Sequence, residues 1–294
     1  MDRVETDVLR LMLSFSDLDS LLLSWRPLSN QFRLLADEEL GFRFEGVFEW
    51  FCNDVESMRH CMRTTAAFIG GSVPLTLFSN LTFTPSNMDI FVRTSRRDQI
   101  LYHLCFIEGY TWQTVGDVIP QSDLPPHASF DDSVVVFGAG LRTVIQLVRP
   151  GSRVSVYTFD DPLFPDFSAD VVTLSWSSAL FNFVSADFAG CAYPALTTQG
   201  RALYHMGRFY SGMPGTASDH LLNTYCSRGF EFSQHPSWWF EPMDRACPRR
   251  WTCPLTGRTF GDGGSLVIPY RERPGGRFGR EWLFGGVTED VHGA

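Results

Sequence analysis

The hydrophobic periodicity of the chain changes near Thr65, and this change constrains the fold more than any other feature. Before Thr65, from about residue 7, apolar residues recur at helical spacing. After it, short apolar runs alternate with turn residues, as in strands joined by helices. We therefore expect an α+β fold with a helical N-terminal segment, a mixed-sheet domain and an irregular C-terminal cap. The expected boundaries are 1–64, 65–205 and 206–294.

Local signals within the N-terminal segment predict several short helices. Ser16-Asp17 and Asn53-Asp54 carry side chains that can accept hydrogen bonds from free backbone N–H groups at helix starts. Gly41 and Gly46 interrupt the apolar pattern, and glycine often ends a helix. We therefore expect breaks at both glycines.

The composition excludes several classes of function. A formal net charge of -9 disfavours an obligate nucleic-acid binder, because contacts with phosphates need a basic face. The 24 basic residues are all arginine, which excludes a Schiff-base lysine and a phosphate-loop lysine. A GC-rich coding sequence and selection against ubiquitin acceptors both remain as explanations for the missing lysine.

Cysteine usage and the first residues indicate a cellular compartment. The seven cysteines are scattered and do not resemble a disulfide framework, which favours a reducing compartment. The N-terminus is acidic where a secretory signal is basic, and no apolar run reaches the roughly 18 residues that span a bilayer. We therefore expect cytoplasmic or nuclear localisation without a membrane partner.

A Gly-Gly-Ser turn is the first feature that points to chemistry. Gly70-Gly71-Ser72 follows a short apolar run and precedes the apolar residues of Val73 to Phe78, which predicts a strand, a tight turn and a short helix. After a Pro-containing loop, Ser86-Asn87-Met88-Asp89-Ile90-Phe91 has the character of a strand. Strand side chains repeat every two residues, so Asn87 and Asp89 point to one side.

The order of these motifs resembles the nucleotidyltransferase fold of the DNA polymerase beta superfamily. With the later motifs VIQLV and LFNFVSADFAGCAYPALT, it is also similar to a group of fungal proteins with a nucleotidyltransferase-like domain, over roughly 65–204. The resemblance implies that Gly70, Gly71 and Ser72 hold nucleotide phosphates through free backbone N–H groups. It also implies that an Asp-x-Asp pair and a third acid on a later strand hold Mg²⁺.

The chain departs from that pattern at two of its three acidic positions. Asn87 replaces the first acid, Asp89 keeps the second, and Gln146 is the candidate for the third. Each amide removes a charge that a two-metal displacement uses to offset phosphates. We therefore expect a weakened catalytic set of Asp89, Asn87 and Gln146. The expected role is nucleotide binding or protein interaction, with Mg²⁺ on Asp89 and Asn87 accompanying a nucleoside triphosphate.

An active Mg-dependent nucleotidyltransferase stays open as an alternative. It would move a nucleoside monophosphate to an acceptor, with another carboxylate assisting Asp89. The candidates for that carboxylate are Asp131, Asp132, Asp160, Asp161 and Asp170.

The N-terminal segment carries a second resemblance. Val8 to Arg33, with Ser16-Asp17-Leu18, Trp25 and Arg26, is similar to a degenerate F-box segment that lacks the usual Leu-Pro opening. The resemblance implies an adaptor whose first helices bind a protein partner through an exposed apolar face. The alternative is a helical bundle whose apolar face packs on the mixed-sheet domain.

The C-terminal cap raises the question of a zinc site. Cys247 and Cys253 are separated more widely than the usual pairs of structural zinc ligands, although Cys226, His220 and His235 lie upstream. We therefore expect buried thiols in a turn-rich cap, and a structural zinc on Cys247 and Cys253 stays open as the alternative.

Overall fold

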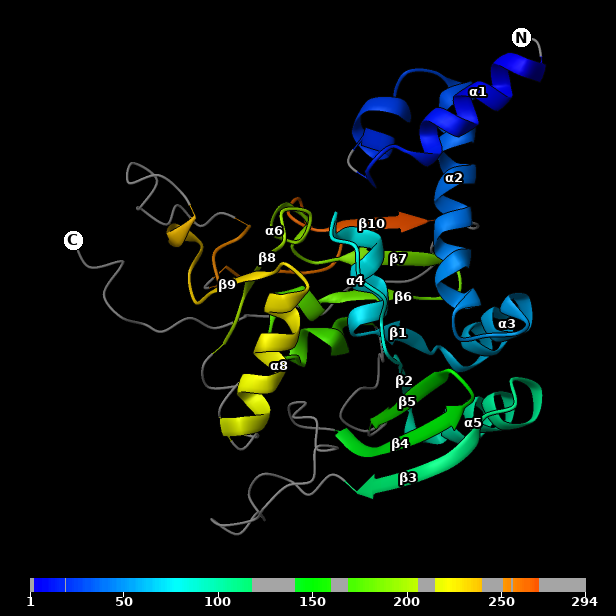
Figure 1. Cartoon of the computed structure of the whole chain (residues 1–294), viewed down its shortest axis with the longest axis vertical. Coiled ribbons are helices and arrows are strands. Elements are labelled where there is room, and N and C mark those ends of the chain that lie inside the picture. The colour runs from blue at the N-terminus through cyan, green and yellow to red at the C-terminus, as the bar shows by residue number, and fades with distance from the viewer. Residues whose placement is uncertain are drawn as a thin grey trace.

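The centre of the fold is an eight-stranded mixed sheet that runs from β10 at one edge to β3 at the other (Figure 1). This computed structural model describes residues 3–18, 20–117, 141–159, 169–205, 215–239, 251–254 and 256–269. The strand order is β10-β7-β6-β1-β2-β5-β4-β3, and β2 and β5 are parallel while the other neighbours are antiparallel. The strands are β1 (Phe68–Gly70), β2 (Met88–Arg93), β3 (Thr111–Asp117), β4 (Leu141–Arg149), β5 (Ser152–Phe159), β6 (Asn182–Val184), β7 (Phe188–Cys191) and β10 (Leu266–Pro269).

Helices surround this sheet. Those before and within its first half are α1 (Arg3–Ser14), η1 (Ser20–Trp25), α2 (Asn30–Glu49), α3 (Val55–Thr65), α4 (Ser72–Phe78), η2 (Thr94–Arg96), α5 (Arg97–Tyr102) and η3 (His103–Ile107). The later elements are η5 (Ala169–Leu174), η6 (Ser178–Leu180), α6 (Pro194–Thr197), β8 (Arg201–Leu203), α8 (Gly215–Ser227), β9 (Glu231–Ser233) and η7 (Pro236–Trp238). Strands β8 and β9 form a separate two-stranded sheet.

The predicted breaks in the N-terminal helices are wrong, because α2 runs without interruption through Gly41 and Gly46. The two glycines meet no neighbouring atom within 4 Å at the position of a Cβ, so each costs only its weak helix propensity, about 1 kcal/mol. The apolar face of α2 outweighs this cost: Leu40, Phe44 and Phe48 are all buried. The predicted helix starts are confirmed, since Asp17 accepts from Ser20 N and Asp54 from Ser57 N.

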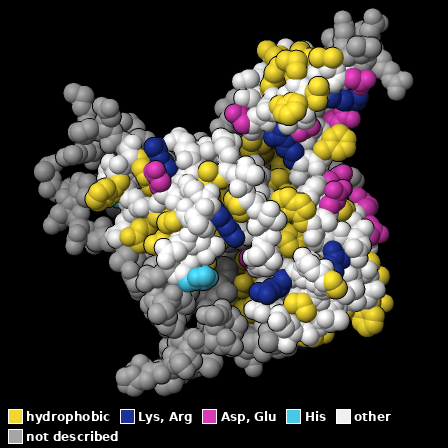
Figure 2. All heavy atoms as spheres, in the orientation of Figure 1, with side chains coloured by type: hydrophobic (Ala, Val, Ile, Leu, Met, Phe, Trp, Pro, Cys, Tyr) yellow, Lys and Arg dark blue, Asp and Glu magenta, His cyan; other side chains and the backbone are white. Residues whose placement is uncertain are grey.

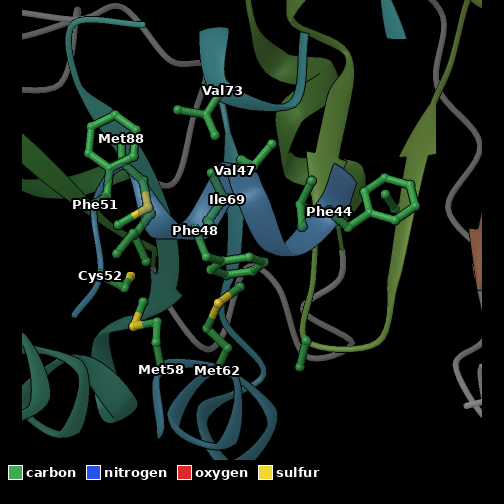
Figure 3. Packing of buried hydrophobic residues seen from close by; sticks show 14 of the residues in the cluster. Phe44, Val47, Phe48, Phe51, Cys52, Met58, Met62, Ile69, Val73 and Met88 are labelled. Carbon is green, nitrogen blue, oxygen red and sulfur yellow. The ribbon is translucent and has the colours of Figure 1, made fainter. Parts of the chain in front are cut away.

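The alternation of β2 gives the sheet two faces of different character. Met88, Ile90 and Val92 point to one face, where α2 and α3 supply Phe48, Met58 and Met62 (Figure 3). Asp89 and Phe91 point to the opposite face, because strand side chains alternate. There, Phe91 stacks on Phe68 and Tyr157 with centroids 5.3 and 5.0 Å apart.

The expected mixed α+β class is confirmed, and the predicted strand, turn and short helix at 66–78 are present. Strand β10 comes from the segment expected to be an irregular cap, and it pairs with β7 at the sheet edge. In the part of the chain that the structure describes, no helix is long and apolar enough to cross a bilayer.

Candidate functional site

The turn between β1 and α4 lies directly against Asp89. In the β1–β2 register Gly70 is opposite Asp89, so the end of β1 meets the start of β2. Gly71 has φ +72° and ψ -144°, a conformation open almost only to glycine. A Cβ on Gly71 would lie 2.2 Å from Asp89 Oδ2. Glycine is therefore required here both by the backbone and by the carboxylate beside it.

The two residues that flank Gly71 are closely enclosed. A Cβ on Gly70 would lie 2.6 Å from Cε2 of Phe91, so the aromatic face of the sheet also demands glycine there. Ser72, the first residue of α4, is buried. The turn is thus held tightly between the sheet and the helix that follows it.

Three neutral side chains surround the Asp89 carboxylate. Asn87 donates Nδ2–H to Asp89 Oδ1 at 2.6 Å, across the two-residue repeat of the strand. Ser155 and Tyr157 on β5 also hydrogen-bond to Asp89. Burial raises the pKa of Asp89 to about 7, against the effect of these three hydrogen bonds, which lower it.

Asp89 is part of a polar row that crosses three strands. Asp89 is paired with Ser155 in the parallel β2–β5 register, and Ser155 is paired with Gln146 in the antiparallel β4–β5 register. Strand β5 thus lies between β2 and β4. The Cα atoms of Asp89 and Gln146 are two strand spacings apart, about 10 Å. The structure thus places Asn87 in contact with Asp89, but it puts Ser155 between Asp89 and Gln146.

Sequence reasoning missed Ser155 and Tyr157. Both belong to a strand that the β-rich run at 153–158 predicts, but nothing local shows that this strand pairs with β2. The two-residue repeat from Ser155 to Tyr157 was the available signal, since both side chains had to share a face.

Metal chemistry at Asp89 is limited by the available ligands. No group of three His, Cys, Asp or Glu side chains suited to a metal ion occurs among the described residues. Asp89 and Asn87 can offer oxygen ligands to one hard cation, but the internal hydrogen bonds already occupy part of that capacity. This donor set does not fit a two-metal centre.

Several sequence candidates fall outside the part of the chain that the structure describes. They are Asp131, Asp132, Asp160, Asp161, the side chain of Asp170, and Cys247. Cys253 is a buried free thiol.

Helix α8 packs near the turn site, which consists of Gly70, Gly71, Ser72 and Asp89. Tyr225 on α8 is buried in a cluster with Leu75 of α4, three residues after Ser72, and with Trp176. Burial raises the pKa of Tyr225 to about 12, Arg228 lowers it, and the charge of Asp89 raises it. Electrostatic effects from both Arg228 and Asp89 therefore reach this hydroxyl.

Comparison with known proteins adds no further assignment. No protein-family model, no curated protein and no solved structure matches the chain. The function is therefore argued from the geometry of the site.

Proposed function

We propose that the protein binds a nucleotide through a nucleotidyltransferase-like domain that has lost most of its catalytic capacity. The phosphates would contact the turn at Gly70, Gly71 and Ser72, and Asp89 with Asn87 would hold one weakly bound Mg²⁺. The observation that carries this proposal is the packing of Asp89 Oδ2 against Gly71, 2.2 Å from where a Cβ would be. A phosphate-binding turn and a metal ligand must lie this close to serve one bound nucleotide.

The surroundings of Asp89 support binding without efficient transfer. Two-metal transfer needs several carboxylates to offset the charge of the ions and phosphates. Here the neighbours of Asp89 are Asn87, Ser155 and Tyr157, all of them neutral. Burial raises the pKa of Asp89 to about 7, so a cation bound there would compete with a proton. A single weakly held cation that accompanies the nucleotide is consistent with these neighbours.

Thermal unfolding with nucleotides tests the proposal. The purified chain is melted with ATP, GTP, CTP or UTP, each with and without Mg²⁺, beside Asp89→Ala and the matched surface control Asp98→Ala. A ligand at about 100 times its Kd adds roughly 2.7 kcal/mol to the stability. We expect a Mg²⁺-dependent rise in Tm that Asp89→Ala loses and Asp98→Ala keeps.

Two outcomes would contradict the proposal. No response of the wild-type chain to any of the four nucleotides would remove the binding role. Efficient release of pyrophosphate with a nucleotide and an acceptor would instead establish the active transferase.

An adaptor role is a second candidate function, favoured by an exposed apolar stripe on α1 and the residue that follows it. The stripe consists of Val8, Leu11, Met12 and Phe15, whose side chains recur at helical spacing on one face. Their exposed fractions lie between 47% and 83%, while neighbouring Leu13 is fully buried. Figure 2 shows hydrophobic side chains gathered over this part of the molecule. The F-box-like resemblance implies an apolar face of this kind.

Substitutions within the stripe test the adaptor role. Leu11→Glu together with Phe15→Glu should abolish capture of an F-box-binding adaptor by the full chain, because charges replace the apolar contact surface. The matched control is Phe106→Glu, an equally exposed aromatic position on η3. Failure of the wild-type chain to bind such an adaptor would remove this function without affecting nucleotide binding.

A further inference from the structure

The guanidinium of Arg228 lies over two aromatic rings. It lies 4.8 Å from the ring centroid of Phe83 and 4.9 Å from that of Tyr225. Phe83 belongs to the loop that leads into β2, and Arg228 follows the last residue of α8. The planar group is therefore fixed in orientation by residues from two distant parts of the sequence.

Four other arginines of the described residues differ from Arg228 in their partners. They pair with carboxylates: Arg59 with Glu56, Arg149 with Glu108, Arg201 with Glu231 and Arg258 with Asp262. Arg228 makes no ion pair with an acidic side chain among the described residues. Arg228 hydrogen-bonds to the Tyr225 hydroxyl, and the remaining N–H donors of a half-buried cation without a carboxylate can bind an anion.

Tyr225 connects Arg228 with the turn. The buried Tyr225 packs in one cluster with Leu75, which lies on the first turns of α4 after Gly71 and Ser72. The charges of Arg228 and Asp89 both act on its hydroxyl. The side of the site that faces α8 thus carries a fixed positive charge.

We propose that Arg228 is an anion-binding residue of the turn site and contacts the phosphate chain of the bound nucleotide. This inference rests on the proposed nucleotide binding, and it brings a residue from beyond 65–205 into the site. Guanidinium donors held in a plane match phosphate oxygens in pairs, and the aromatic rings reduce the ordering cost. In a chain without lysine, arginine is the side chain left to supply such a permanent charge.

Calorimetric titration of the full chain with Mg-ATP and with inorganic triphosphate tests the role of Arg228. We compare wild type with Arg228→Gln and Arg228→Lys. The matched control is Arg201→Gln, which removes a partly exposed arginine that lies 5.7 Å from the Trp239 ring centroid. Losing a hydrogen bond to a charged group should weaken both ligands by roughly tenfold to a hundredfold.

The three variants separate the effect of the positive charge on Kd from the effect of the planar guanidinium. Arg228→Lys keeps the charge but not the planar fork, so it should bind both ligands with an intermediate Kd. Arg201→Gln should bind like wild type. Should Arg228→Gln fail to fold, Arg228→Lys alone decides, because wild-type affinity for triphosphate in that variant excludes paired contacts with phosphate.

The outcomes also separate this inference from the proposed function. Wild-type binding together with unchanged Kd values in Arg228→Gln and Arg228→Lys would overturn the role of Arg228 and leave nucleotide binding intact. Absence of binding by wild type to Mg-ATP and to the other nucleotides would overturn both.

Discussion

Two enclosed carboxylates, Asp89 and Glu108, occupy contrasting environments in the same domain. Glu108 follows η3, is 1% exposed and lies 3.6 Å from Nη1 of Arg149. It also accepts the backbone N–H groups of Asn53 and Asp54 at the start of α3. Among the described residues the hydrogen-bond partners of Asp89 are two hydroxyls and an amide, and burial raises its pKa to about 7. Glu108 therefore has a cation and two backbone N–H donors beside it, whereas the partners of Asp89 are neutral side chains.

The difference separates a carboxylate that stabilises the fold from one that can bind a proton or a cation. Glu108 joins the α2–α3 loop to β4, because Arg149 also donates to the Glu108 backbone oxygen at 3.0 Å. A buried carboxylate with these partners is costly to remove and has no need of a ligand. Asp89 has an incomplete charge balance, so a cation or a proton can complete it. Perturbed groups of this kind gather at functional sites.

The largest effect is expected at Glu108. Glu108→Ala leaves the Arg149 guanidinium and the N–H groups that precede α3 without their acceptor, and should lower the free energy of unfolding by about 3–5 kcal/mol. Urea unfolding at pH 7 measures the change. The control Asp98→Ala breaks a surface pair with Arg97 and should cost less than about 1 kcal/mol. Equal losses in the two variants would show that Glu108 is not a structural anchor.

Gly71→Ala should have the next largest effect, about 3 kcal/mol, because it combines strained backbone with a contact on Asp89. Gly151→Ala is the matched control: its φ is +78°, but nothing lies within 4 Å of its Cβ position. That variant should cost only the conformational part, about 1–2 kcal/mol. The difference measured by urea unfolding reports the contact with Asp89 together with the added backbone strain at the ψ of -144° of Gly71. If both variants lose the same free energy of unfolding, the Asp89 carboxylate moves aside for the new methyl group without a measurable cost.

Local chemistry explains which parts of the site could be predicted from sequence. Gly71 and Asp89 were found because a tight turn and a strand repeat depend only on neighbouring residues. Ser155 and Tyr157 could not be assigned to Asp89, since the parallel pairing of β2 with β5 joins segments more than 60 residues apart in the sequence. Contacts of this range are set by the packing of the whole sheet.

The difference between local features and long-range packing also explains which predictions were wrong or missing elsewhere in the chain. Glycine at position 41 predicted a break, but the tertiary packing of α2 outweighed its propensity. Arg228 was missed because its two aromatic partners are brought together only when α8 packs beside the loop before β2. Local turns and caps were therefore predictable, whereas pairings between elements were not.

Asp89→Asn should stabilise the protein at high pH, although most substitutions of enclosed residues lower the free energy of unfolding. The folded-state pKa of about 7 lies above the ordinary value of 3.8, so folding favours the protonated carboxyl. Its stabilising contribution is present at acidic pH and is lost as the pH rises from about 4 through 7. In EDTA, Asp89→Asn should therefore be more stable than wild type at pH 8, by about 2 kcal/mol, and should lose this advantage at pH 5. Urea unfolding at both pH values measures the two differences, and a constant difference would contradict the shifted pKa.

The smallest effect is expected from Tyr157→Phe, which removes one hydroxyl from Asp89 and keeps the ring stacked on Phe91. A hydrogen bond to a carboxylate is stronger than one to a neutral carboxyl, so the loss should be about 1 kcal/mol greater at pH 8 than at pH 5. Losing this donor should also raise the Asp89 pKa further and move the stability profile to higher pH. Tyr204→Phe is the control, because that hydroxyl meets Gln234 and its loss should not depend on pH. A pH-independent loss in Tyr157→Phe would mean that Asn87 and Ser155 alone set the protonation of Asp89, and that β5 supports the site only through packing.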